Sequence, residues 1–143
     1  MPDVVDRLTS ALNTHDLDAA MRCYRPDAVA VTPEMELGGL EEIGSFFAQL
    51  WQGFPDIHYT VWEKIVSGDA IAAEMVGVGT HTGPWLVVGG EVLEATGRAI
   101  AVRSSWFWNL EDGLIASQRV YYDQLQIYAQ LGMRLPLDFE PSR

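Results

Sequence analysis

The spacing of apolar residues changes once along this chain, close to residue 55, and that change limits what the chain can fold into. Before it, apolar side chains recur every three or four residues, which is the period of one face of an α-helix. After it, they alternate with polar or small residues, which is the period of a β-strand with one buried face. Helices and strands are therefore segregated along the chain, and segregated elements favour the α+β fold class.

Three helices are expected before the change. Residues 2–12 place their apolar side chains on one helical stripe, and Asp3 precedes the stripe as an N-cap. A second short helix begins after Asp16 and is expected to stop at Pro26, so that the first two helices form a hairpin. The third helix carries its apolar stripe over residues 40–51.

Strands dominate the rest of the chain. A β-branched run at residues 28–32 predicts a short strand ahead of the third helix. The alternating segments then predict four antiparallel strands, at 57–66, 70–82, 98–110 and 114–122. A closing helix is expected over residues 124–131, followed by an irregular tail over 133–143.

These elements predict a curved antiparallel sheet with the three N-terminal helices on one face. A sheet of this kind and its helices enclose a conical hydrophobic pocket, a common place for a small ligand. A length of 143 residues suits one domain, so we expect a single domain over residues 1–143. Both faces of the 70–82 strand carry apolar or small residues, and the face away from the helices needs a cover, so we expect a homodimer.

Charge argues against two classes of partner. The chain has 9 Lys and Arg against 20 Asp and Glu, a formal net charge of -11. A surface of this sign repels nucleic acid and anionic membranes, so neither is expected as a partner. No apolar run approaches the roughly 18 residues that a membrane span needs, and no secretory leader pattern opens the chain. We therefore expect a cytoplasmic protein.

Motifs for cofactors and metals are also missing. The three histidines and the lone Cys23 have no metal-ligand spacing, so no metal is expected. The glycines at 77, 79 and 83 have the wrong spacing for a dinucleotide fingerprint. No Gly-x-Ser-x-Gly nucleophile motif is present. We therefore expect an activity, if the chain has one, that uses no cofactor.

A set of short motifs is more informative, because their order and spacing run through nearly the whole chain. They are Gly79-Thr80-His81-Thr82-Gly83-Pro84, Thr96-Gly97-Arg98, Asp112-Gly113-Leu114-Ile115 and Gln130-Leu131-Gly132. Together they resemble the SnoaL-like polyketide cyclase family of the nuclear transport factor 2-like superfamily. The resemblance implies a cone-shaped α+β barrel with a hydrophobic cavity, no cofactor, and often a dimer formed through the outer face of the sheet.

The resemblance also implies an activity, the intramolecular aldol cyclisation of an aromatic polyketide ester by general acid–base chemistry. The superfamily includes isomerases, cofactor-free hydroxylases and binding proteins as well, so the fold alone does not define a function. Counted from Asp112-Gly113, the family's catalytic aspartate falls on Val120, its partner histidine on Trp106 and a pocket asparagine near Ala30. All three positions are apolar here, so the aldol mechanism does not carry over to this chain.

Three other residues are candidate proton carriers. Asp123 is either a general base at the cavity mouth or the N-cap of the closing helix, in a capping box with Gln126. His81 is either a proton shuttle or a structural hydrogen-bonding residue at a strand end. Glu34 lies on a loop at the cavity rim, where it is either a partly buried acid or a solvated carboxylate.

Large aromatic side chains are numerous for a chain of this length, with 5 Trp and 5 Tyr. Trp106 lies on the face that carries catalysis in the family, so we expect it to project into the cavity. Indole N–H groups and tyrosine hydroxyls can orient a ligand oxygen. The expected substrate-binding residues are Tyr24, Trp51, Trp85, Trp106, Val120 and Tyr122.

The sequence therefore predicts a cofactor-independent cyclase or isomerase of a hydrophobic polyketide-type intermediate. Its aromatic pocket would act by shape, desolvation and one or two hydrogen bonds. Two alternatives remain open at this stage. One is a binding module that sequesters a reactive small molecule without changing it, and the other is a cofactor-free hydroxylase.

Overall fold

The computed structural model describes residues 2–86 and 90–134, and within them helices and strands segregate as predicted. The expected tail is described only as far as residue 134, and the rest of it lies outside the described residues. The elements are α1 (Val4–Asn13), α2 (Leu17–Met21), β1 (Tyr24–Val31), β2 (Glu36–Gly38), α3 (Gly39–Gly53), β3 (His58–Ser67), β4 (Ala70–Thr80), β5 (Trp85–Leu86), β6 (Val92–Leu93), β7 (Ala99–Glu111), β8 (Leu114–Tyr122) and α4 (Gln124–Gln130).

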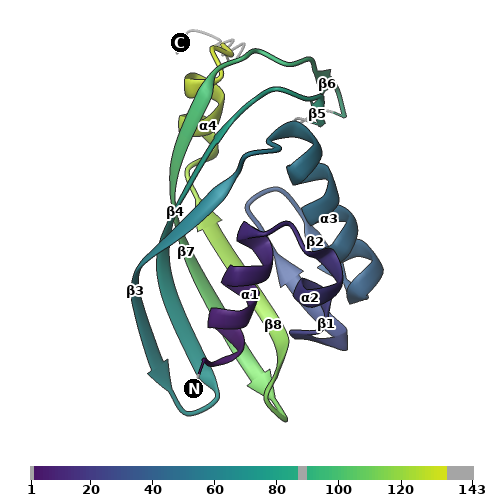
Figure 1. Cartoon of the computed structure of the whole chain (residues 1–143), viewed down its shortest axis with the longest axis vertical. Helices are drawn as coiled ribbons and strands as arrows, with labels where there is room; N and C mark the ends of the chain where they lie inside the picture. The colour runs from purple at the N-terminus through teal and green to yellow at the C-terminus, as the bar shows by residue number, and fades with distance from the viewer. Residues whose placement is uncertain (1, 87–89, 135–143) are drawn as a thin grey trace, which may run out of the picture.

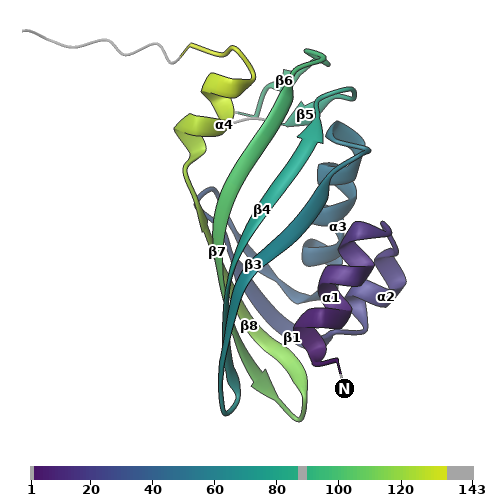
Figure 2. The same cartoon turned by 60° about the vertical axis from the view of Figure 1, so that its left-hand side comes forward.

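Six of the strands form one curved sheet that does not close on itself, in the order β2-β1-β8-β7-β4-β3. Helices α1, α2 and α3 cover its concave face, and α4 lies at the end of the sheet where β8 finishes (Figures 1 and 2). The mixed α+β class and the cone-shaped arrangement are therefore confirmed. A separate hairpin of β5 and β6 lies beside the last turns of α3 (Figure 1).

The prediction of a wholly antiparallel sheet is wrong at one place. β1 pairs with β8 in parallel, with Ala30 opposite Gln118. Hairpin partners must run antiparallel, but β1 and β8 are separated by the rest of the sheet and by α3, so no turn dictates their direction. Sequence periodicity reports which side of a strand is buried and does not report the direction of its neighbour.

The expected role of Pro26 is also wrong. Helix α2 ends at Met21, and Pro26 lies inside β1. The pairing of β1 with β8 shifts in register between Tyr24 and Val29. Proline cannot donate a hydrogen bond to a sheet ladder, and an irregular stretch of strand is where it is tolerated. Pro26 therefore interrupts the pairing of a strand instead of stopping a helix.

The alternation within β4 and β7 divides the sheet into an inner and an outer face. Inward side chains of β7 are buried, and they are Ile100, Val102, Ser104, Trp106 and Trp108. The outer face keeps large apolar side chains in contact with solvent, including Trp62, Ile65, Val78, Phe107 and Tyr121. Arg103 lies 5.2 Å above the Trp62 ring, and Arg119 lies 5.7 Å above the Phe107 ring. Both faces of the sheet therefore carry apolar residues, as the sequence predicts.

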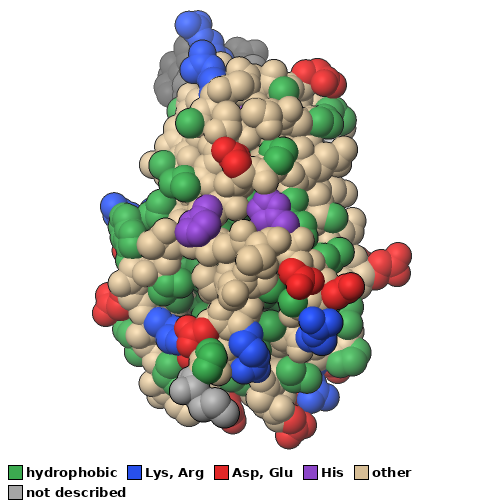
Figure 3. Space-filling view, viewed as in Figure 1, with side chains coloured by type: hydrophobic (Ala, Val, Ile, Leu, Met, Phe, Trp, Pro, Cys, Tyr) green, Lys and Arg blue, Asp and Glu red, His purple; other side chains and the backbone are tan. Residues whose placement is uncertain are grey.

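Charged side chains of the two signs lie among one another on the face that Figure 3 shows. On the face that carries the helices, acidic and basic groups are interspersed with apolar ones and form no continuous basic patch (Figure 3). Among the described residues, no helix is both long enough and apolar enough to cross a membrane.

The edge of the sheet formed by β3 is covered in part by the side chain of Asn13, the last residue of α1. The Asn13 amide donates from Nδ2 to the Tyr59 carbonyl at 2.9 Å, and its Oδ1 accepts the Tyr59 N–H at 2.7 Å. Both backbone groups of Tyr59 are thus satisfied as they would be by a neighbouring strand. These two hydrogen bonds attach the last residue of α1 to the second residue of β3.

We expect Asn13→Ala to lower the free energy of unfolding by about 1–3 kcal/mol, because it removes two half-buried hydrogen bonds and leaves an N–H and a carbonyl without partners. Urea denaturation of the wild type and the variant measures this change. Asn109→Ala is the matched control, since that amide is exposed on β7, and its effect should be much smaller. Equal losses in the two variants would contradict the edge-covering role of Asn13.

Candidate functional site

A cavity of about 100 Å³ opens between the inner face of the sheet and helix α3. Its wall combines the sheet, the loop after β1, helix α3 with the residue after it, β5 and α4. The lining residues are Thr32, Glu34, Met35, Phe46, Gln49, Leu50, Phe54, Ile57, Tyr59, Gly77, Trp85, Ile100, Val102, Ser104, Trp106, Val120, Tyr122 and Ile127. Most of them are apolar or aromatic, which is the usual composition of a site for a hydrophobic small molecule.

Residues 106 and 120 are cross-strand neighbours on the adjacent strands β7 and β8. In the antiparallel pairing of β7 with β8, Trp106 lies directly opposite Val120, and both side chains are buried in the cavity wall. The third position, Ala30, is buried in β1 but is not part of this wall. The two positions predicted for an acid–base pair thus lie side by side on the cavity and carry an indole and an isopropyl group.

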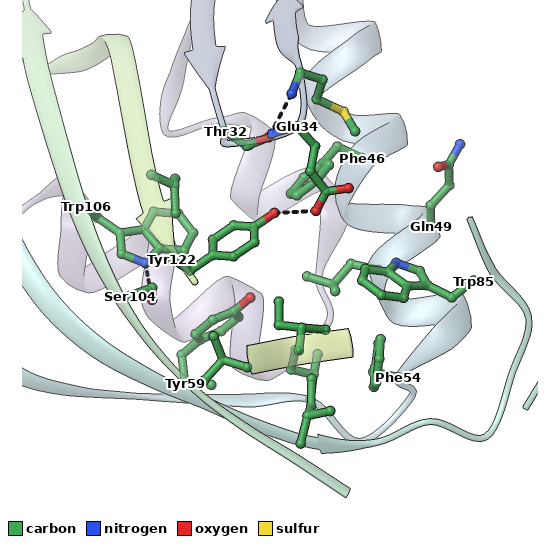
Figure 4. A pocket seen from close by; sticks show the side chains of 18 residues that line it. Thr32, Glu34, Phe46, Gln49, Phe54, Tyr59, Trp85, Ser104, Trp106 and Tyr122 are labelled. Carbon is green, nitrogen blue, oxygen red and sulfur yellow. Dashed lines mark hydrogen bonds between the residues drawn. The ribbon is translucent and has the colours of Figure 1, made fainter. Parts of the chain in front are cut away.

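Trp106 is held firmly as a wall residue. Its indole N–H donates to Ser104 Oγ at 2.8 Å (Figure 4). Its ring stacks on Trp108 at 5.6 Å between centroids, and the Tyr59 ring meets it edge-on at 5.8 Å. Since the N–H already has an acceptor, Trp106 offers a ligand an apolar surface and no free hydrogen-bond donor.

Glu34 and Tyr122 meet at the polar side of the cavity. The Tyr122 hydroxyl donates to Glu34 Oε1 at 2.9 Å, and both side chains are half-buried in the wall (Figure 4). Burial and the neighbouring Glu34 carboxylate raise the pKa of Tyr122, so its phenol stays neutral. Thr32 Oγ1 accepts the backbone N–H groups of Glu34 and Met35, each at 3.2 Å, and so shapes the loop that presents the carboxylate.

Tyr59 belongs to the site but is not among the residues predicted from the sequence. Its hydroxyl points into the cavity (Figure 4), and burial raises its pKa above the usual value. Its ring crosses Gly77, where a Cβ would lie 2.8 Å from Tyr59 Cε1. The missed signal was the alternation of 57–66, which places Ile57 and Tyr59 on the same inner face. Gly77 therefore serves the packing of a cavity residue.

Helix α3 supplies further wall residues that sequence reasoning did not single out. Phe46, Gln49 and Leu50 face the cavity from one side of the helix, and Phe54 follows its last turn. Their spacing is the apolar stripe already used to predict the helix. The stripe marks what is buried, and it does not distinguish side chains that pack into the core from those that line a hollow beside it.

His81 is fully buried but does not line the cavity. The ring of Phe54, a cavity residue, lies against it at 5.3 Å between centroids. His81 Nδ1 accepts the Thr96 N–H at 3.1 Å, and its own backbone pairs with Arg98 and Gly97. Burial lowers the pKa of His81, which keeps the imidazole neutral. The structure thus favours the hydrogen-bonding interpretation of His81 over contact with a substrate.

Asp123 is exposed and caps helix α4. Its Oδ1 accepts the backbone N–H groups of Leu125 at 3.0 Å and Gln126 at 3.3 Å. The side chain lies in a shallow groove on the outer side of the sheet, beside Trp62 and Arg103, and not at the cavity. The helix-capping interpretation accounts for Asp123, and its proposed role as a base at the cavity mouth has no support in this geometry.

Two expected substrate contacts also lie elsewhere. The Tyr24 hydroxyl donates to Gln118 Oε1 at 2.6 Å, and this oxygen also accepts the Trp108 N–H at 2.8 Å, so Tyr24 belongs to a buried core cluster. Trp51 stacks on His15 with 4.9 Å between ring centroids. Neither side chain is part of the cavity wall, whereas Trp85, Trp106, Val120 and Tyr122 are. In residues 2–86 and 90–134, no group of three or more His, Cys, Asp or Glu side chains is placed to hold a metal ion.

A curved sheet with helices on its concave face and an apolar cavity between them is the ketosteroid isomerase-like fold of NTF2-like proteins. The sequence model of the SnoaL-like polyketide cyclase family matches residues 2–131. The chain therefore belongs to the SnoaL-like polyketide cyclase family.

Solved structures share this fold. A candidate SnoaL-like polyketide cyclase from Jannaschia sp. CCS1 is 23% identical, with 92% of this chain and 91% of that one covered and a TM-score of 0.80. IdmH from Streptomyces antibioticus, a candidate polyketide cyclase, is 25% identical over 91% and 96% with a TM-score of 0.75. AclR from Streptomyces galilaeus, a candidate hydroxylase, is 19% identical over 90% and 92% with a TM-score of 0.77. None of the curated proteins matches the sequence.

The depressed pKa of His81 predicts a pH dependence of stability. The unfolded histidine titrates near 6.5, above the folded value, so the unfolded chain binds more protons and stability falls as the pH drops through this range. We expect His81→Asn, whose amide oxygen can replace Nδ1 as acceptor for Thr96, to lose less stability than wild type between about pH 7.5 and about pH 5.5. Urea denaturation at both pH values measures the difference. His58→Asn, at an exposed histidine, should keep the wild-type dependence.

Proposed function

We propose that this protein is a cofactor-independent enzyme that cyclises or isomerises a hydrophobic polyketide-type intermediate. The observation that carries the proposal is the cavity itself. The cavity of this SnoaL-like family member has a mostly apolar and aromatic wall, in which the Tyr122 hydroxyl donates to Glu34 and the Tyr59 hydroxyl points inward.

The arrangement supports catalysis by position. Trp106 is fixed by Ser104 and by two neighbouring rings, so the wall it forms is rigid. A rigid apolar wall holds a flexible substrate in one folded conformation and brings its reacting carbons together. Orientation of this kind can lower a barrier by about 7 kcal/mol or more in favourable cases. The reaction then needs few charged groups, in agreement with the indole and isopropyl side chains at positions 106 and 120.

The test is incubation of the purified protein with an aromatic polyketide ester whose last ring is open, followed by mass spectrometry. Ring closure gives an isomer, or a product that has lost one water molecule. A hydroxylase, the activity suggested for AclR, would consume oxygen and add one oxygen atom to the substrate. A binding module would retain the ester unchanged. A product with added oxygen, or an unchanged ester that remains bound, would reject the cyclase proposal.

Within this proposal, we expect Trp106→Ala to reduce turnover about a hundredfold, because the substrate is no longer held in its reactive conformation. Asp123→Asn is the control, and its turnover should stay within about twofold of wild type, since asparagine caps a helix nearly as well as aspartate. Turnover is measured for both variants after circular dichroism has shown that they are folded. Loss of turnover in Asp123→Asn, with Trp106→Ala intact, would favour an acid–base mechanism at the other site.

We also propose that the protein is a homodimer through the outer face of the sheet, where Trp62 and Ile65 are 53% and 60% exposed. Light scattering should give a mass near twice 15.9 kDa at micromolar concentration. Phe107→Glu places a charge in the centre of this face and should shift the mass towards the monomer. Val92→Glu, at an exposed residue of β6 away from that face, should leave the mass unchanged. A wild-type mass of one chain would contradict the proposal.

A further inference from the structure

The described part of the cavity wall contains one charged side chain, the Glu34 carboxylate. Every other polar group on that wall is neutral at ordinary pH: Thr32, Gln49, Tyr59, Ser104 and Tyr122. No Lys or Arg is among the described lining residues, so a negative charge of the ligand would find no positively charged partner there. The described wall therefore holds one charged hydrogen-bond acceptor and no positively charged donor, and most of its other side chains are apolar.

Only one of the two Glu34 oxygens is occupied. Oε1 accepts the Tyr122 hydroxyl at 2.9 Å, and among the described residues no side chain or backbone group donates to Oε2. A carboxylate has room for about four hydrogen bonds over its two oxygens. The Tyr122 hydroxyl, by donating to Glu34, fixes the direction of the carboxylate and leaves the second oxygen available to a ligand in the cavity (Figure 4).

We propose that Glu34, positioned by Tyr122, selects the ligand of this cavity, which is a neutral molecule that presents a phenolic or enolic hydroxyl to the free carboxylate oxygen. This inference rests on the proposed function and names the substrate class for it. A hydroxyl donor completes the hydrogen bonding of the carboxylate without adding charge to an apolar site. A substrate that carries a free carboxylate is excluded, because two negative charges would meet in a poorly solvated space.

Tyr122 cannot offset the repulsion between Glu34 and a substrate carboxylate. Its proton is already donated to Glu34, and a phenol is never a cation, so Tyr122 supplies no positive charge. The resulting order of preference is a hydroxyl first, its methyl ether second and a carboxylate last.

A cationic ligand is the main competitor, because aromatic cages with a nearby carboxylate bind ammonium groups. Two of the cavity rings, Trp106 and Phe54, are already packed against other aromatic rings. Trp106 stacks on Trp108, and Phe54 contacts the rings of both His81 and Trp85. Moving a charged ammonium group from water into a mostly apolar cavity costs more free energy than burying a neutral phenol, so the observations favour the hydroxyl.

The test uses single-ring probes whose size suits a cavity of about 100 Å³. The probes are p-cresol, its methyl ether, p-toluate and 4-methylbenzylamine. Binding to the full chain is followed through the indole N–H resonances in NMR titrations, since Trp85 and Trp106 line the cavity. We expect p-cresol to bind about tenfold more tightly than the methyl ether, and p-toluate not to bind.

Two variants and one control assign the preference to the proposed residues. Glu34→Gln should remove most of the preference for p-cresol, leave the methyl ether unaffected and allow p-toluate to bind. Tyr122→Phe should weaken the preference for p-cresol while the affinity for the ether is retained, because only the orientation of Glu34 is lost. Glu36→Gln, at an exposed carboxylate two residues further along the chain at the start of β2, should match the wild type.

Each of the other outcomes overturns the inference. Equal affinity of the wild type for p-cresol and its ether, or an unchanged ratio in Glu34→Gln, shows that Glu34 does not select the ligand. Tighter binding of 4-methylbenzylamine assigns the site to a cation. These results leave the proposed cyclase function intact, whereas the absence of binding by all four probes contradicts both the inference and the proposed ligand cavity. The wild-type comparison alone decides the matter if a variant fails to fold.

Discussion

The inner side of strand β7 is the surface on which both the core and the cavity depend. β7 is the longest strand, and it lies between β4 and β8 in the middle of the curved sheet. Its inward residues run from Ile100 to Trp108, and they belong to both buried clusters of the molecule. Because this row is apolar, helices must cover it. The helices cover this row only in part, and a cavity remains between the concave face of the sheet and α3.

Satisfied polar groups allow this cavity to stay apolar. The Trp106 N–H is taken up by Ser104, and the Tyr122 hydroxyl is taken up by Glu34. Below the cavity, Gln118 accepts hydrogen bonds from Tyr24 and Trp108 in the same way. Each bond removes a donor that would otherwise need water or a ligand. What remains for a ligand is an apolar wall, the Tyr59 hydroxyl and one carboxylate oxygen, which together are the basis of both functional proposals.

Some of the residues expected to bind a substrate lie on the cavity wall, and others lie elsewhere. Trp106 and Val120 were placed by the family resemblance, counted from Asp112-Gly113, and both line the cavity because the β7–β8 hairpin sets their register. Tyr24 and Trp51 carry the same kind of side chain but pack against Gln118 and His15. For Asp123 and His81, the sequence left two interpretations open, and hydrogen bonds made within the tertiary structure favour the structural one for each.

The sequence by itself determined the order of helices and strands, the face that each strand buries and the family to which the chain belongs. Periodicity and short motifs are local properties, so they survive without knowledge of the fold. Only the tertiary structure decided that β1 runs parallel to β8, that Tyr59 lies over Gly77, and that Glu34 meets a tyrosine 88 residues away. Such contacts depend on the curvature of the sheet and on the packing of segments far apart in the chain, and no local pattern encodes either of them.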